Sequence, residues 1–106
     1  MGQIRRMRPP SHPGQALKAM VIEPRNIHIS ELADSIGMSR KTISQILNGN
    51  ARLTPVVASK LARALNISSI PWVNMQTSLD LFEAEQDLQQ WQPAKVWSEE
   101  STHDRV

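Results

Sequence analysis

The feature that most constrains the fold is a tight turn at Gly37-Met38-Ser39 between two short segments with helical apolar spacing. Helices joined in this way form a helix-turn-helix unit, in which the first helix braces the second and the second can be presented outward. Ala33 supplies the small residue needed where the helices cross, and Gly37 supplies a turn residue that tolerates positive φ. The pattern predicts a bracing helix over 29–36 and a presented helix over 39–50, although a helical hairpin without a ligand explains it equally well. The residues expected to face the core are Ile36, Met38, Ile43 and Ile46.

Length and composition predict that the rest of the chain is helical too. The sequence has 106 residues, about one domain's worth, with one Phe and no Tyr. Its apolar residues are mainly Leu, Ile, Ala, Val and Met, which suit helices better than sheets. We therefore expect an all-α, five-helix domain over 12–92, preceded by a flexible basic arm over 1–11 and followed by a mobile tail over 93–106.

Start and stop residues bound three further helices, predicted over 13–24, 54–66 and 69–90. A proline stands in the first turn of each, where its missing N–H costs nothing, and Thr54 and Ser69 are suitable N-caps. His12 is expected at the start of the first helix, His28 as a cap of the helix over 29–36, and Asn66 at the end of the helix over 54–66. The expected core-facing residues are Leu17, Met20 and Val21 in the first of the three helices, and Val57, Leu61, Ala64 and Leu65 in the second.

The outer face of the helix over 39–50 has a composition that indicates DNA readout. Its side chains are short or forked polar groups that can bond base edges and phosphates, and no acidic residue is present to repel DNA. An ordinary exposed helix would more often carry mixed Glu and Lys at i, i+4 spacing. The predicted DNA-binding residues are Ser39, Arg40, Lys41, Ser44, Gln45, Asn48 and Arg52, with Arg40 and Gln45 as candidates for base contacts and Ser39, Lys41 and Arg52 for phosphate.

Charge divides the chain into a basic and an acidic half. Up to Asn66, ten basic residues against three acidic ones give a net charge of +7, and beyond it two against seven give −5. The basic half would attract a polyanion and the acidic half a basic protein, although charge that only keeps the chain soluble is the alternative. The arm carries Arg5, Arg6 and Arg8, which could enter a minor groove or contact phosphates. Alternatively, the arm could have no role.

Several functional classes are disfavoured by composition. The chain has no cysteine for disulfides, thiol catalysis or zinc, and His12, His28 and His103 have no carboxylates at metal-ligand or triad spacing. No glycine-rich phosphate loop occurs. We therefore expect neither an enzyme nor a bound cofactor or metal. No apolar run reaches the ~18 residues of a membrane span, so no membrane partner is expected, and a cytoplasmic location, at the nucleoid when bound to DNA, is compatible.

A resemblance to a known family rests on three stretches. ISELADSIGMSRKTISQILNGNARLTPVVASKLARAL resembles the lambda repressor-like (XRE) helix-turn-helix domain. His12-Pro13-Gly14 before it and SSIPWVNMQTSLDL after it narrow the resemblance, over 12–90, to HigA-type antitoxins, also described as virulence-associated protein I-like. One position departs from the pattern, because Ile29 stands where many such domains begin the second helix with a phosphate-binding glutamine.

The resemblance implies an antitoxin that neutralises a RelE-like, mRNA-cleaving toxin and, as a homodimer on operator DNA, represses its own operon. A palindromic operator requires two reading helices about one DNA turn (~34 Å) apart. The alternatives are a stand-alone XRE-family transcriptional regulator without a toxin partner, and a protein-interaction module that has lost DNA binding.

The last predicted helix carries an apolar and an acidic set of residues, and each set has two possible roles. Apolar residues at helical spacing could form the dimer seam or simply pack on the core. Acidic residues could meet a basic toxin or form a solvated face. The apolar set is Trp72, Met75, Leu79 and Phe82, and the acidic set is Asp80, Glu83, Glu85 and Asp87.

Overall fold

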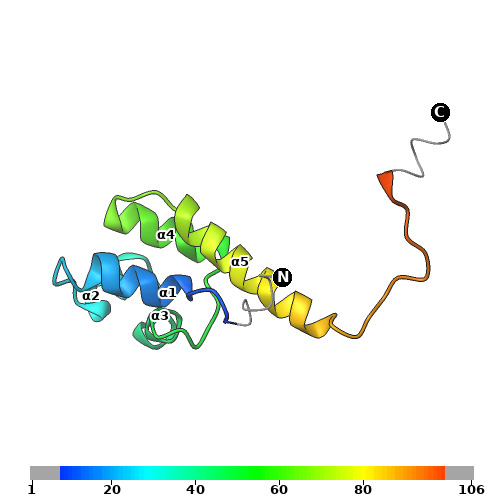
Figure 1. The fold of residues 1–106 in the computed structure, drawn as a ribbon. Helices are drawn as coiled ribbons and strands as arrows, with labels where there is room; N and C mark the ends of the chain where they lie inside the picture. Colours follow the sequence, from blue (N-terminus) through cyan, green and yellow to red (C-terminus); the bar gives the residue numbers. More distant parts are fainter. Residues whose placement is uncertain (1–7, 100–106) are drawn as a thin grey trace.

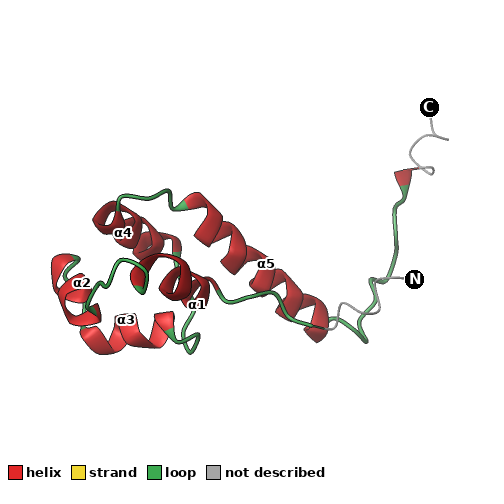
Figure 2. Ribbon diagram, turned by 60° about the vertical axis from the view of Figure 1, so that its left-hand side comes forward, coloured by secondary structure: helices red, strands yellow, loops and turns green. Residues whose placement is uncertain are grey.

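The computed structural model describes residues 8–99 as a bundle of helices followed by an extended tail (Figure 1). Figure 2 shows helices and loops but no strand in this range. The first helix begins as α1 and continues without a break as the π-helical segment η2, so the predicted all-α, five-helix fold is confirmed. The elements are α1 (Pro13–Leu17), η2 (Lys18–Ile22), α2 (Ile29–Ser35), α3 (Arg40–Leu47), α4 (Pro55–Leu65) and α5 (Ile70–Asp87).

The helix ends agree with most of the start and stop residues expected from the sequence. Ser39 Oγ accepts a hydrogen bond from Thr42 N at 3.1 Å and so caps α3, as Thr54 does for α4. His12 Nδ1 accepts from Gly14 N at 2.9 Å at the start of α1. Asn66 ends α4 with a left-handed backbone at φ 58°. These ends form because local side chains satisfy the backbone groups that a helix terminus leaves unpaired.

Two of the expected caps are wrong in detail. His28 occupies the N-cap position of α2, but its side chain makes no capping hydrogen bond. At the start of α5 the capping oxygen comes from Ser68, which accepts from Ile70 N at 3.2 Å, and Ser69 makes no side-chain cap. Either of two adjacent serines can thus cap the helix, and the sequence alone does not show which of them does.

The core differs from the predicted stripes at two positions. Met20 is 68% exposed, and Ile22 is buried in its place, because the wider turn of η2 breaks the regular spacing on which the prediction relied. In α4 the predicted core residue Ala64 is exposed, and Ala62 is buried in its place, one helical turn after the buried Ala58. The largest fully buried side chains are Leu17, Ile43, Leu47, Leu53, Leu61 and Pro13.

The last helix, α5, lies along the bundle with its first half only. Trp72 and Val73 pack against the core, and Gln76 is buried. Farther along, Leu81 is 59% exposed, and the helix projects beyond the other helices before the tail leads away from them (Figures 1 and 2). The longest helix therefore presents its outer half to solvent. None of the helices in residues 8–99 combines the length and apolar character needed to cross a membrane.

Candidate DNA interface

The presented helix of the helix-turn-helix unit is α3, and its buried side fixes how it is displayed. Ile43, Ile46 and Leu47 are almost completely buried against the bundle. Gly37 makes the preceding turn at φ 71°, a conformation that glycine adopts without strain. The opposite face of α3 is consequently held outward by core packing.

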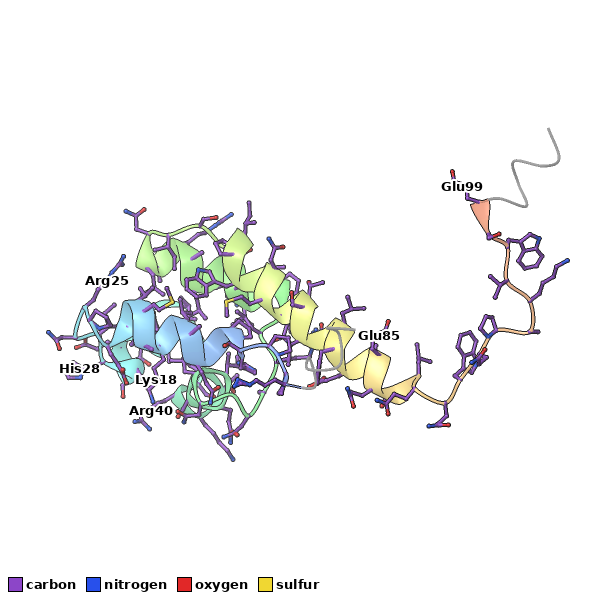
Figure 3. The ribbon with its side chains drawn as sticks, viewed as in Figure 1. Lys18, Arg25, His28, Arg40, Glu85 and Glu99 are labelled. Carbon is purple, nitrogen blue, oxygen red and sulfur yellow. The ribbon has the colours of Figure 1, made fainter. Side chains whose placement is uncertain are left out.

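Three side chains on that outward face are free to bind a ligand. Arg40, Lys41 and Gln45 are exposed, and within the described residues no hydrogen bond or ion pair engages their side chains. Figure 3 shows Arg40 at the edge of the bundle, on the same side as Lys18. Guanidinium, ammonium and amide groups in this arrangement can donate to phosphates and to base edges in a major groove.

The other predicted DNA-binding residues already have partners within the chain. The Ser39 hydroxyl donates to Thr42 Oγ1 at 2.8 Å besides capping α3. Asn48 Nδ2 donates to Ser44 Oγ at 3.3 Å. Arg52 forms an ion pair with Asp80. A phosphate contact from Ser39 would therefore require its proton to be redirected, whereas the Arg52 guanidinium keeps further N–H groups for an anion.

The C-terminal end of α3 is held by the first helix. Gly14 lies so close to it that a Cβ at this position would overlap the carbonyl oxygen of Ile46. Gln15 Nε2 donates to the Asn48 carbonyl oxygen at 3.1 Å, and Lys18 Nζ donates to Asn48 Oδ1 at the same distance. These contacts set the direction of α3 relative to the bundle.

The loop that follows α3 is held by α5. Leu53 N donates to Gln76 Oε1 at 2.8 Å, and Gln76 Nε2 donates to Asp80 Oδ1 at 2.9 Å. On the other side of the loop, a 3.0 Å hydrogen bond joins His12 Nε2 to the carbonyl oxygen of Ala51. The sequence motifs assign no role to Gln76, although a lone amide on the inward face of a helix is a usable signal.

The predicted dimer residues lie along the same side of α5. Trp72 packs against the core of its own chain. Met75, Leu79 and Phe82 are half-buried and so keep apolar surface that a second copy could cover. The dimer seam stays a prediction, in which Trp72 would serve the core as well.

The acidic residues of α5 separate into two groups. Asp80 is used internally by Gln76 and Arg52. Glu83, Glu85 and Asp87 are exposed on or near the projecting half, and Figure 3 shows Glu85 well away from the bundle. Of the basic arm, Arg8 is described and exposed, while Arg5 and Arg6 lie outside the described residues, as does His103 of the tail.

Comparison with known sequences identifies relatives over most of the chain. The family described as "Helix-turn-helix" matches residues 17–73. The chain is 40% identical over 76 residues to "Antitoxin HigA-1" of Vibrio cholerae, in an alignment that covers 72% of this chain and 71% of that protein. It is 33% identical over 81 residues to "Uncharacterized HTH-type transcriptional regulator YbaQ" of Escherichia coli strain K12, covering 76% and 72%.

A solved structure with the same fold contains DNA. The Pseudomonas aeruginosa antitoxin HigA, solved with the higBA promoter, superposes on this chain with a TM-score of 0.70 at 23% identity. The superposition covers 81% of this chain and 99% of that chain, and at this identity it speaks for the fold alone. The sequence relatives confirm the resemblance to HigA-type antitoxins that the sequence motifs predicted.

Proposed function

The chain belongs to the helix-turn-helix family, among relatives of the HigA antitoxin type, and from that premise we propose that it is the antitoxin of a toxin–antitoxin pair and represses its own operon. In this proposal it neutralises a RelE-like, mRNA-cleaving toxin encoded by a neighbouring gene. A homodimer binds operator DNA near that gene pair in the cytoplasm. The 40% identity to an antitoxin over most of both chains supports the toxin-binding half.

The observation that carries the DNA-binding half is the free outward face of α3. Arg40 and Gln45 can each make paired hydrogen bonds, to guanine and adenine respectively, once α3 enters a major groove. Lys41 is suited to phosphate, since a single ammonium makes a point contact. The brace of α1 behind Asn48 supports this role, because base readout requires a helix held in one orientation.

A second copy of the chain is part of the proposal. Two α3 helices must lie about one DNA turn (~34 Å) apart to bind the halves of a palindromic operator together. Met75, Leu79 and Phe82 are the residues we assign to the contact between the copies. The acidic residues beyond them suit a basic toxin, with electrostatic attraction steering the encounter.

The test is an affinity capture of the tagged chain from its native host, with nuclease present at moderate salt, followed by mass spectrometry. We expect a stoichiometric small basic protein that arrests growth when it is expressed alone. The matched control is Arg40→Ala/Gln45→Ala, which should capture the same protein but fail to bind operator DNA in a separate binding assay without nuclease. Recovery of the chain alone would reject the antitoxin role and favour a stand-alone regulator, the function that the name of the E. coli relative suggests.

A further inference from the structure

Within residues 8–99, Gln76 is the buried polar side chain, with 5% of its surface exposed. It lies on α5, yet both of its polar atoms are used, one by the loop after α3 and one by Asp80. Asp80 in turn binds Arg52 from the same loop with its other carboxylate oxygen. Two side chains of α5 thus hold two consecutive residues of the loop, Arg52 and Leu53.

An apolar side chain would not replace Gln76. Leu53 is 1% exposed, and its N–H would lose its partner, because Gln76 Oε1 is the acceptor at 2.8 Å. A buried N–H without an acceptor is costly, since it has given up its hydrogen bonds to water. The amide is therefore needed to keep the loop backbone on α5.

We propose that Gln76 is a positioning residue for DNA binding, fixing the loop over 48–53, and with it the end of α3 and Arg52, against α5. The inference rests on the proposed DNA-binding function and deepens it. The loop begins at Asn48, directly after the recognition helix, and ends at Leu53. A movement of α5 would consequently be passed to the helix that contacts DNA.

Gln76→Glu separates the two bonds of the amide. The new carboxylate can still accept from Leu53 N, but it cannot donate to Asp80 and instead repels it. Adding Asp80→Asn reverses the polarity of the pair: the new amide at position 80 donates to position 76 and still accepts from Arg52. The double variant has the same net charge as the native chain, so a difference between these two proteins cannot be due to net charge.

Asp80→Asn alone gives an independent test at a position that is only partly buried. Asparagine has one side-chain oxygen, so it cannot accept from both Gln76 and Arg52. Removing an acidic charge should by itself strengthen binding to all DNA. Glu83→Gln is the matched control, because it removes the same charge three residues along α5 from a side chain outside the network. If Gln76 has the positioning role, Asp80→Asn should lower the preference for one DNA sequence over another, whereas Glu83→Gln should leave this preference unchanged.

The experiment measures binding to a duplex from directly upstream of the proposed gene pair and to a random duplex of equal length, over a range of salt concentrations. We expect Gln76→Glu to reduce the preference for the upstream duplex about tenfold, as one misplaced base contact would, and the double variant to restore it. Repulsion between Asp80 and the new carboxylate should loosen the bond from Leu53 N, so hydrogen exchange at the Leu53 amide should become faster in Gln76→Glu and recover in the double variant. Circular dichroism checks that each variant is folded.

The outcomes distinguish this inference from the proposed function. The positioning role would be overturned if Gln76→Glu folded and kept the native preference for the upstream duplex. It would also be overturned if the double variant regained protection of the Leu53 amide from hydrogen exchange without regaining that preference. If Gln76→Glu does not fold, the test depends on Asp80→Asn. Equal preference for the upstream duplex in Asp80→Asn and Glu83→Gln would then overturn the positioning role. A native chain with no preference for its upstream duplex would instead reject DNA-dependent repression itself, and with it the basis of the inference.

Discussion

Lys18 Nζ donates a 3.1 Å hydrogen bond to Asn48 Oδ1, so that the first helix reaches the residue that ends the recognition helix. The same asparagine donates from its Nδ2 to Ser44 Oγ. Because Asn48 lies between the bundle and the DNA-binding face, its contribution to folding and its contribution to binding can be separated by one substitution.

Asn48→Asp should keep the fold and weaken DNA binding. The carboxylate accepts a stronger, charge-assisted bond from Lys18 but places a negative charge at the end of the face that meets phosphates. We expect the melting temperature to hold or rise while affinity falls on every duplex. Asn50→Asp, which adds the same charge two residues farther along the loop, is the comparison. A fall in stability together with affinity would contradict this account.

Arg40→Ala should cost ~1 to 3 kcal/mol of operator binding if this side chain contacts a guanine, and the preference at one base pair should relax. Lys60→Ala is the control, since it removes one positive charge from an exposed position on α4. Binding measured against a set of single-base operator variants gives the answer. An equal loss on all sequences would assign Arg40 to phosphate.

Gly14→Ala should destabilise the domain by ~1 to 3 kcal/mol, the usual cost of forcing an extra methyl into a packed contact. The new Cβ would collide with the Ile46 carbonyl oxygen, a backbone atom that cannot turn aside. Denaturant unfolding measures the change, with Ala19→Ser, at an exposed position of the same first helix, as the control. Unchanged stability would mean that α1 can move away from α3 at little cost.

Phe82→Asp should shift the chain toward monomer and lower operator affinity, because the two half-sites are then bound independently. Ala84→Asp introduces the same charge on a different face of α5 and should leave assembly unchanged. Light scattering at several concentrations measures the molecular mass. A stable dimer in Phe82→Asp would place the contact between copies elsewhere.

Local signals predicted the helices and most of their ends. Ser39 and Thr54 were identified as caps because the groups that they satisfy lie three residues away in the chain. Met20 was wrongly assigned to the core, since an α-helical spacing was extended through a π-helical segment. Periodicity is thus reliable only where the helix type stays constant.

The contacts that support α3 could not be predicted, because they join distant parts of the chain. Gln76 and Leu53 are 23 residues apart, and Lys18 and Asn48 are 30 apart. Residue type alone predicted that Arg40, Lys41 and Gln45 would be exposed on one face. It could not predict that Arg52 has an acidic partner on α5, since that requires knowing how α5 crosses the bundle.

The projecting half of α5 also has a consequence for how long the chain survives. The end of α5 over 83–87 is exposed, and so short a piece of helix is marginal in water without neighbours. This end therefore unwinds more often than the bundle, and its amides exchange faster than those of the bundle. Proteases cut unwound segments, and the rate of cutting follows the fraction of time that a segment is open. Whatever covers this end of the helix therefore protects the whole chain from degradation.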